Sequence, residues 1–362
     1  MTSRPVRCLA ITGPGAAAVV PTEEPAPGPG QAWIRTLWSG VSAGTEMALL
    51  GGTDPHHEAG WDRRLRAFGT GPRSGYPILG PGYMEVGVVE ESDSATLRAG
   101  DVVALPYGHR TGHCCDPARE VPVVVPEDLD QVLGIYLAQM GPICANGVLH
   151  AAVELEGSAA DPRTALRGHR LVVTGAGVVG LLSALLAQHL GAEVVVVEPS
   201  ADRREVATAL GLDVLADDGT AGVAVKERWG DDDTRRGAEL VLQCRGHSGS
   251  LAAALQSLRP HGTVVDLAFY QGGAPDVRLG EEFHHNWLTI RCAQIGRVPR
   301  GTEDRWDRQA LAALTLDLLR ARGTDLRAHV VTDVVDLEDG PALLADLAAR
   351  RRSGLTAVLR MS

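Results

Sequence analysis

The sequence predicts an α/β protein in which a doubly wound parallel sheet accompanies a smaller antiparallel β domain. Two patterns carry this prediction. Across residues 171–292, short apolar runs alternate with helical stretches, as strands and helices do in a doubly wound sheet. The first 50 residues instead hold short runs separated by turns rich in Pro and Gly, which is typical of antiparallel strands. A length of 362 residues fits two domains.

The elements expected before the parallel sheet follow from periodicity and from turn residues. They are strands at 8–11 and 32–37, a helix within 38–50, a long loop at 51–78, strands at 80–89 and 100–104, an irregular segment at 107–117, a helix at 130–153 and a polar linker at 154–169.

The parallel sheet and the C-terminal region are expected to contain the remaining elements. Sheet strands are expected at 171–173, 194–197, 214, 240–244, 263–268 and 288–292; two amphipathic helices near 307–322 and 340–350 surround a strand at 329–335, and a final strand at 355–359 returns to the first domain.

A glycine-rich stretch, VVTGAGVVG at 172–180, stands between a strand and a helix, which is the context of a dinucleotide-binding turn. Gly175 permits a tight turn, and Gly177 lets the backbone approach a pyrophosphate. Gly180 allows close packing of helix and strand. Val178 and Val179 belong to the same turn, and the N-terminus of the helix expected at 181–190 supplies free N–H groups that attract phosphate. A glycine-rich turn that binds nothing is the alternative.

Glu198 ends the next strand, where its carboxylate can accept hydrogen bonds from the adenosine ribose hydroxyls. Its negative charge would repel a 2′-phosphate, which favours NAD(H) over NADP(H). Ser200, Arg203 and Arg204 follow directly, however, and could bind that phosphate if Glu198 turned away. The sequence thus favours NAD(H) and leaves NADP(H) open.

Composition excludes several classes of partner. The net charge is −11 and no basic stripe occurs, which argues against nucleic acid. No apolar stretch is long enough to span a membrane. The six cysteines lack paired spacing, which fits a reducing cytoplasm. Lys226 is the one lysine and lies in a polar stretch, which argues against Schiff-base chemistry.

With these motifs, the whole chain resembles the medium-chain dehydrogenase/reductase superfamily, the zinc-type alcohol dehydrogenase-like proteins. SGVSAGTE at 39–46, PGYMEVGVV at 81–89 and EEFHHNWLTIRCAQIG at 281–296 are similar to its bacteriochlorophyllide-type dehydrogenase branch. The resemblance implies a GroES-like β catalytic domain at 1–140, a Rossmann domain at 141–297 and a C-terminal segment at 298–362 that completes the catalytic domain. It also implies a small-molecule substrate and a homodimer in which the strand at 288–292 pairs between subunits.

Further cofactor contacts are implied by the same resemblance. Cys244 and Arg245 would flank the adenine–ribose side of the dinucleotide. Phe269 would lie near the nicotinamide, and Gln294 and Arg297 would reach the cofactor from a neighbouring loop.

The expected zinc ligands are missing. Zinc enzymes of the family place a Cys in the loop where Ser42 stands, a His where Tyr83 stands and a third ligand near Pro142. Catalytic zinc takes three ligands from thiolate, imidazole and carboxylate groups, plus a water, so no zinc is expected here. A metal site remains an alternative interpretation, because four possible ligands lie close together in the chain: His109, His113, Cys114 and Cys115. Their spacing fits a polar active-site loop better.

Without a metal, organic side chains must handle the proton that accompanies hydride transfer. Tyr83 is the first candidate for a proton or hydrogen-bond donor. Glu46 is expected to orient Ser42 or Thr45, or to act as a base. Tyr107, His109 and His113 are candidate relay or specificity residues. The alternatives are a packed aromatic side chain at Tyr83 and a helix-start carboxylate at Glu46.

The function expected from these observations is zinc-independent, NAD(P)-dependent oxidoreduction of a small organic molecule. The expected reaction interconverts a secondary alcohol and a ketone in specialised biosynthesis. Reduction of a C=C or C=N bond is the alternative reaction, because conjugation makes zinc unnecessary there. A catalytically silent cofactor-binding protein is the alternative class.

Overall fold

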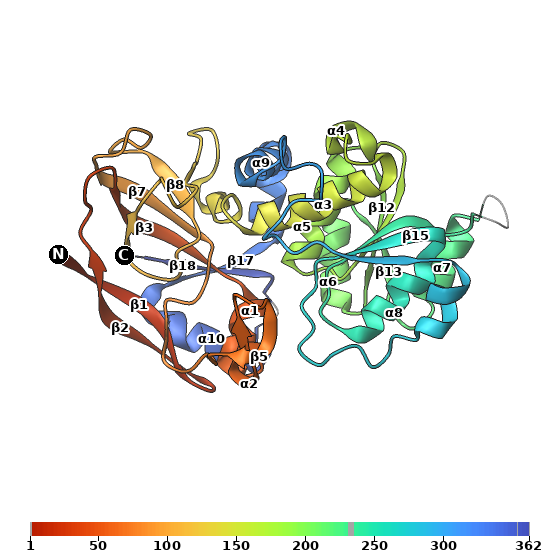
Figure 1. The fold of residues 1–362 in the computed structure, drawn as a ribbon, viewed down its shortest axis with the longest axis horizontal. Coiled ribbons are helices and arrows are strands. Elements are labelled where there is room, and N and C mark those ends of the chain that lie inside the picture. The colour runs from red at the N-terminus through yellow and green to blue at the C-terminus, as the bar shows by residue number, and fades with distance from the viewer. Residues whose placement is uncertain (1, 231–234, 353, 362) are drawn as a thin grey trace. The chain divides into compact units, whose positions relative to one another are not determined.

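The computed structural model describes residues 2–230, 235–352 and 354–361 and resolves two compact units (Figure 1). The first unit contains the described residues up to Gln139 and those from Val330 onward, and the second contains Met140–His329. The division differs from the expected one at residues 298–329, which lie in the second unit rather than with the C-terminal segment.

The second unit is built on a six-stranded parallel sheet, as predicted. Its strand order is β13 (Asp213–Ala216), β12 (Glu193–Glu198), β11 (Arg170–Thr174), β14 (Ala238–Gln243), β15 (Leu258–Asp266) and β16 (Thr289–Cys292). The inner strands consist of continuous apolar runs, because helices cover both faces of the sheet. Val172, Val195 and Val241 in these strands are fully buried. The chain runs outward from β11 to β13 and then crosses back to β14, so a switch point lies between β11 and β14.

Helices cover both faces of this sheet, as Figure 1 shows. Helices α3 (Met140–Glu156) and α5 (Val178–His189) pack together, and α7 (Ala221–Arg228) and α8 (Ser248–Ser257) form a second packed pair. The remaining helical elements of the unit are α4 (Pro162–Ala165), α6 (Ala201–Ala209), the π-helical turn η2 (Leu279–Phe283) and α9 (Arg308–His329).

The first unit contains two main sheets and a small hairpin. The larger sheet has the order β10 (Val123–Val124), β8 (Val102–Leu105), β7 (Glu85–Ser92), β3 (Ala32–Val41), β18 (Thr356–Arg360) and β17 (Val331–Asp336), with β9 (Gly112–Cys115) also paired to β3. The second sheet is β2 (Ala16–Pro25), β1 (Ser3–Gly13) and β6 (Ile78–Leu79), and the hairpin is β4 (Gly60–Asp62) with β5 (Ala67–Gly71). Its helices are α1 (Ala43–Gly51), α2 (Pro55–Glu58), α10 (Gly340–Ala348) and the 3₁₀ turns η1 (Gln131–Tyr136) and η3 (Leu337–Asp339).

The last strand completes the first unit, as predicted. β18 pairs antiparallel with β3 on one side and parallel with β17 on the other. Leu359 of this strand is fully buried and packs in a core cluster with Leu9, Ile11 and Val41.

Three predicted segments were wrong in detail. The expected loop at 51–78 contains the β4–β5 hairpin, because the Asp62 carboxylate accepts hydrogen bonds from the backbone N–H groups of Arg64 and Leu65 and fixes its turn. The expected irregular segment at 107–117 contains β9, which is a strand because β3 offers it a partner. The helix expected at 130–153 is divided into η1 and α3, and the Asp130 side chain caps the first of these.

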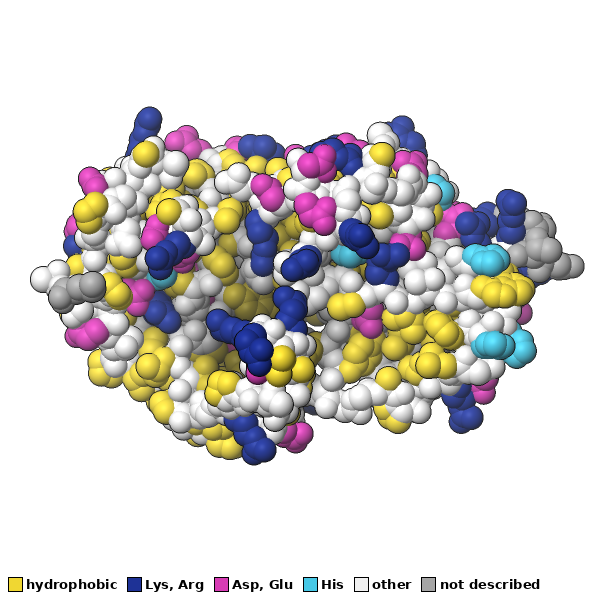
Figure 2. Space-filling model, viewed as in Figure 1, with side chains coloured by type: hydrophobic (Ala, Val, Ile, Leu, Met, Phe, Trp, Pro, Cys, Tyr) yellow, Lys and Arg dark blue, Asp and Glu magenta, His cyan; other side chains and the backbone are white. Residues whose placement is uncertain are grey.

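The surface matches the charge analysis. Figure 2 shows the Lys and Arg side chains of one face dispersed among acidic and uncharged ones. None of the helices in the described ranges is long and apolar enough to cross a membrane.

Candidate functional site

The turn between β11 and α5 has the geometry that a bound dinucleotide requires. Gly175 has φ of +95°, a conformation that other residues rarely adopt. A Cβ at Gly180 would lie 1.8 Å from the carbonyl oxygen of Gly175, so helix and strand can meet this closely only at glycine. A Cβ at Gly177 would meet only one atom, the Arg203 Nη1 at 4.0 Å, so the space in front of this backbone is open. Val178 and Val179 form the first turn of α5, where backbone N–H groups are unsatisfied by the helix.

Glu198 ties this turn to the end of β12. Its side chain is buried, with 2% exposure. One carboxylate oxygen accepts a hydrogen bond from the Ala176 N–H at 2.7 Å, and the other accepts one from the Ser200 N–H at 2.8 Å. The carboxylate therefore holds the glycine turn and the start of α6 at fixed positions, and each oxygen keeps a second lone pair for a hydroxyl donor.

The other residues expected to bind the cofactor follow strands of the same sheet. Because the strands are parallel, their carboxyl ends share one edge, where ligands of such sheets bind. Cys244 and Arg245 follow β14, Phe269 follows β15, Gln294 follows β16, and Ser200 and Arg203 follow β12.

The arginines at this edge differ in their partners. Arg204 donates hydrogen bonds to the carbonyl oxygens of Glu198 and Pro199, so it is engaged by the backbone. Arg245 donates to the Ser250 hydroxyl at 2.9 Å and lies 3.8 Å from the Asp217 carboxylate. Arg203 is exposed on α6. The described residues thus leave the Arg203 guanidinium as the more available cation beside the turn.

In the first unit, the structure brings together four of the five residues expected to carry catalysis. The Ser42 hydroxyl and the Tyr83 hydroxyl are 2.5 Å apart, and the Thr45 hydroxyl lies 3.5 Å from that of Tyr83. Ser42 occupies the N-cap position of α1 but gives its hydroxyl to Tyr83 rather than to the helix. The Glu46 carboxylate instead reaches back to the Ser42 N–H at 2.7 Å.

Behind these residues lies a fully buried polar cluster around His109. The imidazole Nε2 is 2.9 Å from the Glu46 carboxylate, and Nδ1 is 2.6 Å from the Ser39 hydroxyl. Ser39 donates its single proton to the Glu85 carboxylate at 2.8 Å, so it accepts from Nδ1 of His109. Both ring nitrogens therefore act as donors while Glu46 is ionised, which makes His109 an imidazolium.

The pKa shifts of His109 and Glu85 agree with a protonated His109 in this cluster. Burial lowers the pKa of His109, but the Glu46 carboxylate and the charge of Glu85 outweigh it, so the net shift is upward. Burial raises the pKa of Glu85 against the opposing attraction of His109 and the Ser39 hydrogen bond. Both shifts mean that the folded protein holds protons more tightly here than the unfolded chain does.

His113 does not join this cluster. Its ring lies between Glu24 and Glu120, at 2.9 Å and 2.8 Å, and stacks on Tyr107 with ring centres 4.4 Å apart. Burial lowers the pKa of His113, but attraction to these carboxylates outweighs it, so the net shift is upward. We interpret His113 and the two glutamates as a structural ion-pair cluster. The proton-holding histidine near Tyr83 is therefore His109.

Ser39 and Glu85 are residues of this site that sequence reasoning missed. Ser39 stands on β3 and Glu85 begins β7, inside stretches that read as ordinary strands. One signal was available at Gly82, where a Cβ would lie 2.6 Å from Cε1 of His109. A glycine directly before the candidate Tyr83 indicates that another group packs against that backbone.

The described side chains do not fit a zinc centre. Ser42 and Tyr83 offer hydroxyls rather than the thiolate and imidazole ligands that a catalytic zinc usually takes. His109 and His113 each use both ring nitrogens for other partners. No group of three or more His, Cys, Asp or Glu side chains among the described residues is arranged to hold a metal ion.

Comparisons with known proteins agree with this architecture. A family model described as zinc-binding dehydrogenase matches residues 178–314. The chain is 26% identical over 323 residues to D-guloside 3-dehydrogenase of Escherichia coli (strain K12), covering 86% of this chain and 87% of that protein. It is 29% identical over 278 residues to L-threonine 3-dehydrogenase of Pyrococcus horikoshii, covering 72% and 75%. A zinc-binding dehydrogenase structure from Sinorhizobium meliloti 1021 bound to NADP superposes with a TM-score of 0.72, 18% identity and 99% coverage of both chains.

These matches show that the chain is similar to zinc-binding, alcohol dehydrogenase-like dehydrogenases. It is accordingly an enzyme of the NAD(P)-dependent oxidoreductase class. This chain combines a glycine-rich turn after β11 in the second unit with the hydroxyl pair of Ser42 and Tyr83 in the first.

Replacing His109 with Gln should destabilise the protein in a pH-dependent way. Because the folded pKa of His109 is raised, its stabilisation is fully present below the unfolded pKa of about 6.5 and is lost as pH rises through the folded pKa. At pH 6 we expect His109→Gln to lower the free energy of unfolding by about 3–5 kcal/mol, because it leaves two buried carboxyl groups without their cation.

Urea denaturation between pH 6 and pH 9 measures this effect, with the exposed His285→Gln as the control. The difference in the free energy of unfolding between wild type and His109→Gln, the stability gap, should narrow toward pH 9. A gap that stays constant over this range would contradict an imidazolium at His109.

Proposed function

We propose that this protein is a zinc-independent, NAD(H)-dependent dehydrogenase that interconverts a secondary alcohol and a ketone. The observation that carries the proposal is the turn at Gly175–Gly180, whose backbone contact and open front suit a dinucleotide pyrophosphate. When bound, the nicotinamide supplies or accepts the hydride. The side chains of the chain must then manage the proton.

The choice of a secondary alcohol is supported by the names of the relatives. D-guloside 3-dehydrogenase and L-threonine 3-dehydrogenase are both named for oxidation at an internal carbon, and an internal carbon that carries a hydroxyl is a secondary alcohol. The substrate itself is not carried over at 26% and 29% identity. Specialised biosynthesis remains the metabolic setting that we propose.

NAD(H) is favoured by the setting of Glu198. A carboxylate fixed by two backbone N–H groups cannot turn away from the ribose without breaking both bonds. A 2′-phosphate would approach this negative charge, while Arg204 is occupied by carbonyl oxygens. The structure with NADP supports a nicotinamide cofactor in general, and the exposed Arg203 keeps NADP(H) as the alternative.

Tyr83 is the proposed proton donor and acceptor at the substrate oxygen. Its hydroxyl is half-buried and hydrogen-bonded to Ser42, whose side chain is 4% exposed. Glu46 fixes the Ser42 backbone, and His109 fixes Glu46, so the cluster behind Ser42 restrains the hydroxyl that Tyr83 contacts. Such restraint maintains the alignment that proton transfer requires.

Two further features of the proposal rest on the resemblance and on exposed surface. We propose a homodimer that pairs through β16, an edge strand of the parallel sheet whose four residues are exposed. Ile290 within this strand is 37% exposed, and Trp287, two residues before the strand begins, is 66% exposed. The bacteriochlorophyllide-type branch remains a proposal based on the three sequence stretches, and a cytoplasmic location fits six free cysteines.

Replacing Tyr83 with Phe should remove the proton donor and leave the fold intact. We expect kcat to fall about 10²- to 10⁴-fold, the range of general acid–base catalysis, with no change in NADH affinity. Turnover is measured as NADH formation with a panel of secondary alcohols that includes L-threonine and alkyl hexosides. Tyr76→Phe is the matched control, since its hydroxyl only binds the Leu49 carbonyl oxygen. Full activity of Tyr83→Phe, or turnover of enones and imines alone, would overturn the proposal.

Activity should not require zinc. Prolonged treatment with 1,10-phenanthroline is expected to leave kcat unchanged, because Ser42 and Tyr83 are not good zinc ligands. Elemental analysis of the active protein should find far less than one zinc per chain. Stoichiometric zinc whose removal abolishes turnover would show that the proton is handled by a metal-bound group instead.

A further inference from the structure

A preformed pocket lies beside the segment that follows β16. Its volume is about 350 Å³, within the range of small-molecule sites. Two stretches line it, residues 295–298 and 303–311. The first stretch leaves the carboxyl edge of the parallel sheet, the edge that also carries the dinucleotide turn. One wall of the pocket therefore begins at the carboxyl edge of the sheet, next to its edge strand β16.

Both walls of the pocket are held by buried hydrogen bonds. The amide of Asn146, which is fully buried on α3, donates to the carbonyl oxygens of Ala293 and Arg297 at 3.3 Å and 3.1 Å. On the other wall, the buried Thr302 hydroxyl donates to the Pro299 carbonyl oxygen at 2.7 Å. The Trp306 N–H donates to the Thr302 carbonyl oxygen at 2.9 Å. A ligand would thus meet a shape that needs little reorganisation.

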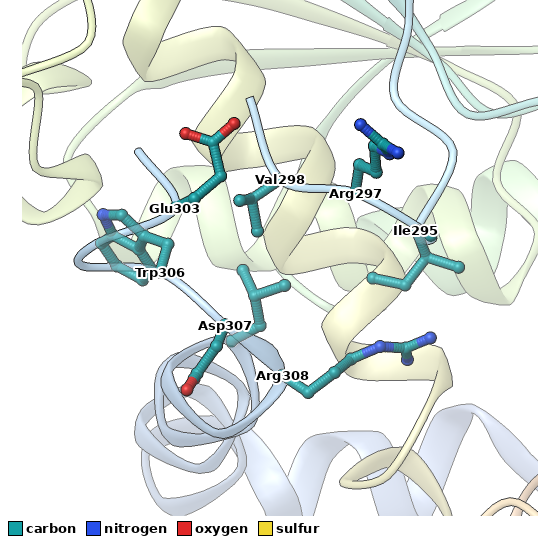
Figure 3. A pocket seen from close by; sticks show the side chains of 9 residues that line it. Ile295, Arg297, Val298, Glu303, Trp306, Asp307 and Arg308 are labelled. Atoms are coloured by element: carbon teal, nitrogen blue, oxygen red, sulfur yellow. The ribbon is translucent and has the colours of Figure 1, made fainter. Parts of the chain in front are cut away.

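Apolar and charged side chains occupy different parts of the lining. Trp306 is 7% exposed, Leu311 is 1% exposed, and Ile295 and Val298 complete the apolar surface. Figure 3 shows Arg297 and Arg308 extending on one side of the pocket with Ile295 between them, while Glu303 and Trp306 lie on the other side.

The charges in this lining are not equivalent. Hydrogen bonds from its own backbone N–H and from the Gly301 N–H, the latter at 2.7 Å, lower the pKa of the Glu303 carboxyl. The Asp307 carboxylate accepts a hydrogen bond from the Ala310 N–H at 2.8 Å. Arg297 has no carboxylate within ion-pair distance among the residues that the structure describes. Arg308 is half-buried, and burial lowers its pKa, so an anion beside it would interact in a poorly solvated setting.

We propose that this pocket binds the carboxylate of a small organic acid, which Arg297 holds while its carbon chain packs on Trp306 and the neighbouring aliphatic side chains. Planar guanidinium groups match carboxylates in geometry as well as in charge. The inference deepens the proposed function and rests on it in one respect, because it makes the dehydrogenase substrate a hydroxy acid or an oxo acid.

Isothermal titration calorimetry on the full chain, with no cofactor added, tests the site directly. The probes are 3-hydroxyhexanoate and hexane-1,3-diol, which share a carbon chain and differ in the carboxylate. We expect the acid to bind about 10- to 100-fold more tightly than the diol, the effect of a charge-assisted hydrogen bond. Arg297→Gln should remove this preference. Arg300→Gln, an exposed arginine outside the lining, should keep it.

Each outcome decides the proposal. Equal binding of the two probes by wild type, no binding of the acid, or an undiminished preference in Arg297→Gln would overturn it. A parallel NADH titration separates it from the proposed function. Failure of NADH to bind, with Arg297-dependent acid binding intact, would remove the dehydrogenase proposal and leave the carboxylate site. NADH binding with no dependence of acid binding on Arg297 would remove only the site.

Discussion

The contact between Gly180 and the carbonyl oxygen of Gly175 is the constraint on which the rest of the second unit depends. At this point the first turn of α5 meets the end of β11 so closely that a Cβ would lie 1.8 Å from that oxygen. The contact directs the unsatisfied N–H groups of the helix toward the carboxyl edge of the sheet. Glu198 then joins the turn to β12 through Ala176, so two neighbouring strands present one rigid surface to a ligand.

The first unit is organised by a different requirement, the compensation of buried charge. Glu46 and Glu85 are both fully buried, and carboxylates in such positions are costly unless a cation and hydrogen bonds offset their desolvation. His109 supplies the cation, and Ser39 joins it to Glu85. Because Glu46 also holds the Ser42 backbone, the cluster that neutralises these charges also positions the Ser42–Tyr83 pair. Stability and the alignment of the proposed proton donor therefore depend on the same side chains.

Much of the parallel-sheet unit could be predicted from the sequence, because its signals are local. The strand at Arg170–Thr174, the glycines after it and Glu198 at the end of the next strand are close in the chain and follow strict geometric rules. The first unit was harder. His109 and His113 are four residues apart, and nothing local distinguishes them. Their partners, Glu46 and Glu85 in one case and Glu24 and Glu120 in the other, are mostly distant in sequence and are brought together by tertiary structure. The β4–β5 hairpin was missed for a related reason, since its turn depends on one side chain, Asp62.

Binding of NADH to wild type and to Gly180→Ala tests the central claim most directly, with Gly272→Ala as the matched control because a Cβ there meets nothing within 4 Å. Titration calorimetry, with folding verified by circular dichroism, should show NADH bound by wild type and by Gly272→Ala. Gly180→Ala should bind at least about tenfold more weakly, because the added methyl separates the helix from the strand that together form the phosphate site. Failure of wild type to bind either pyridine dinucleotide, or equal affinity in Gly180→Ala, would contradict the account.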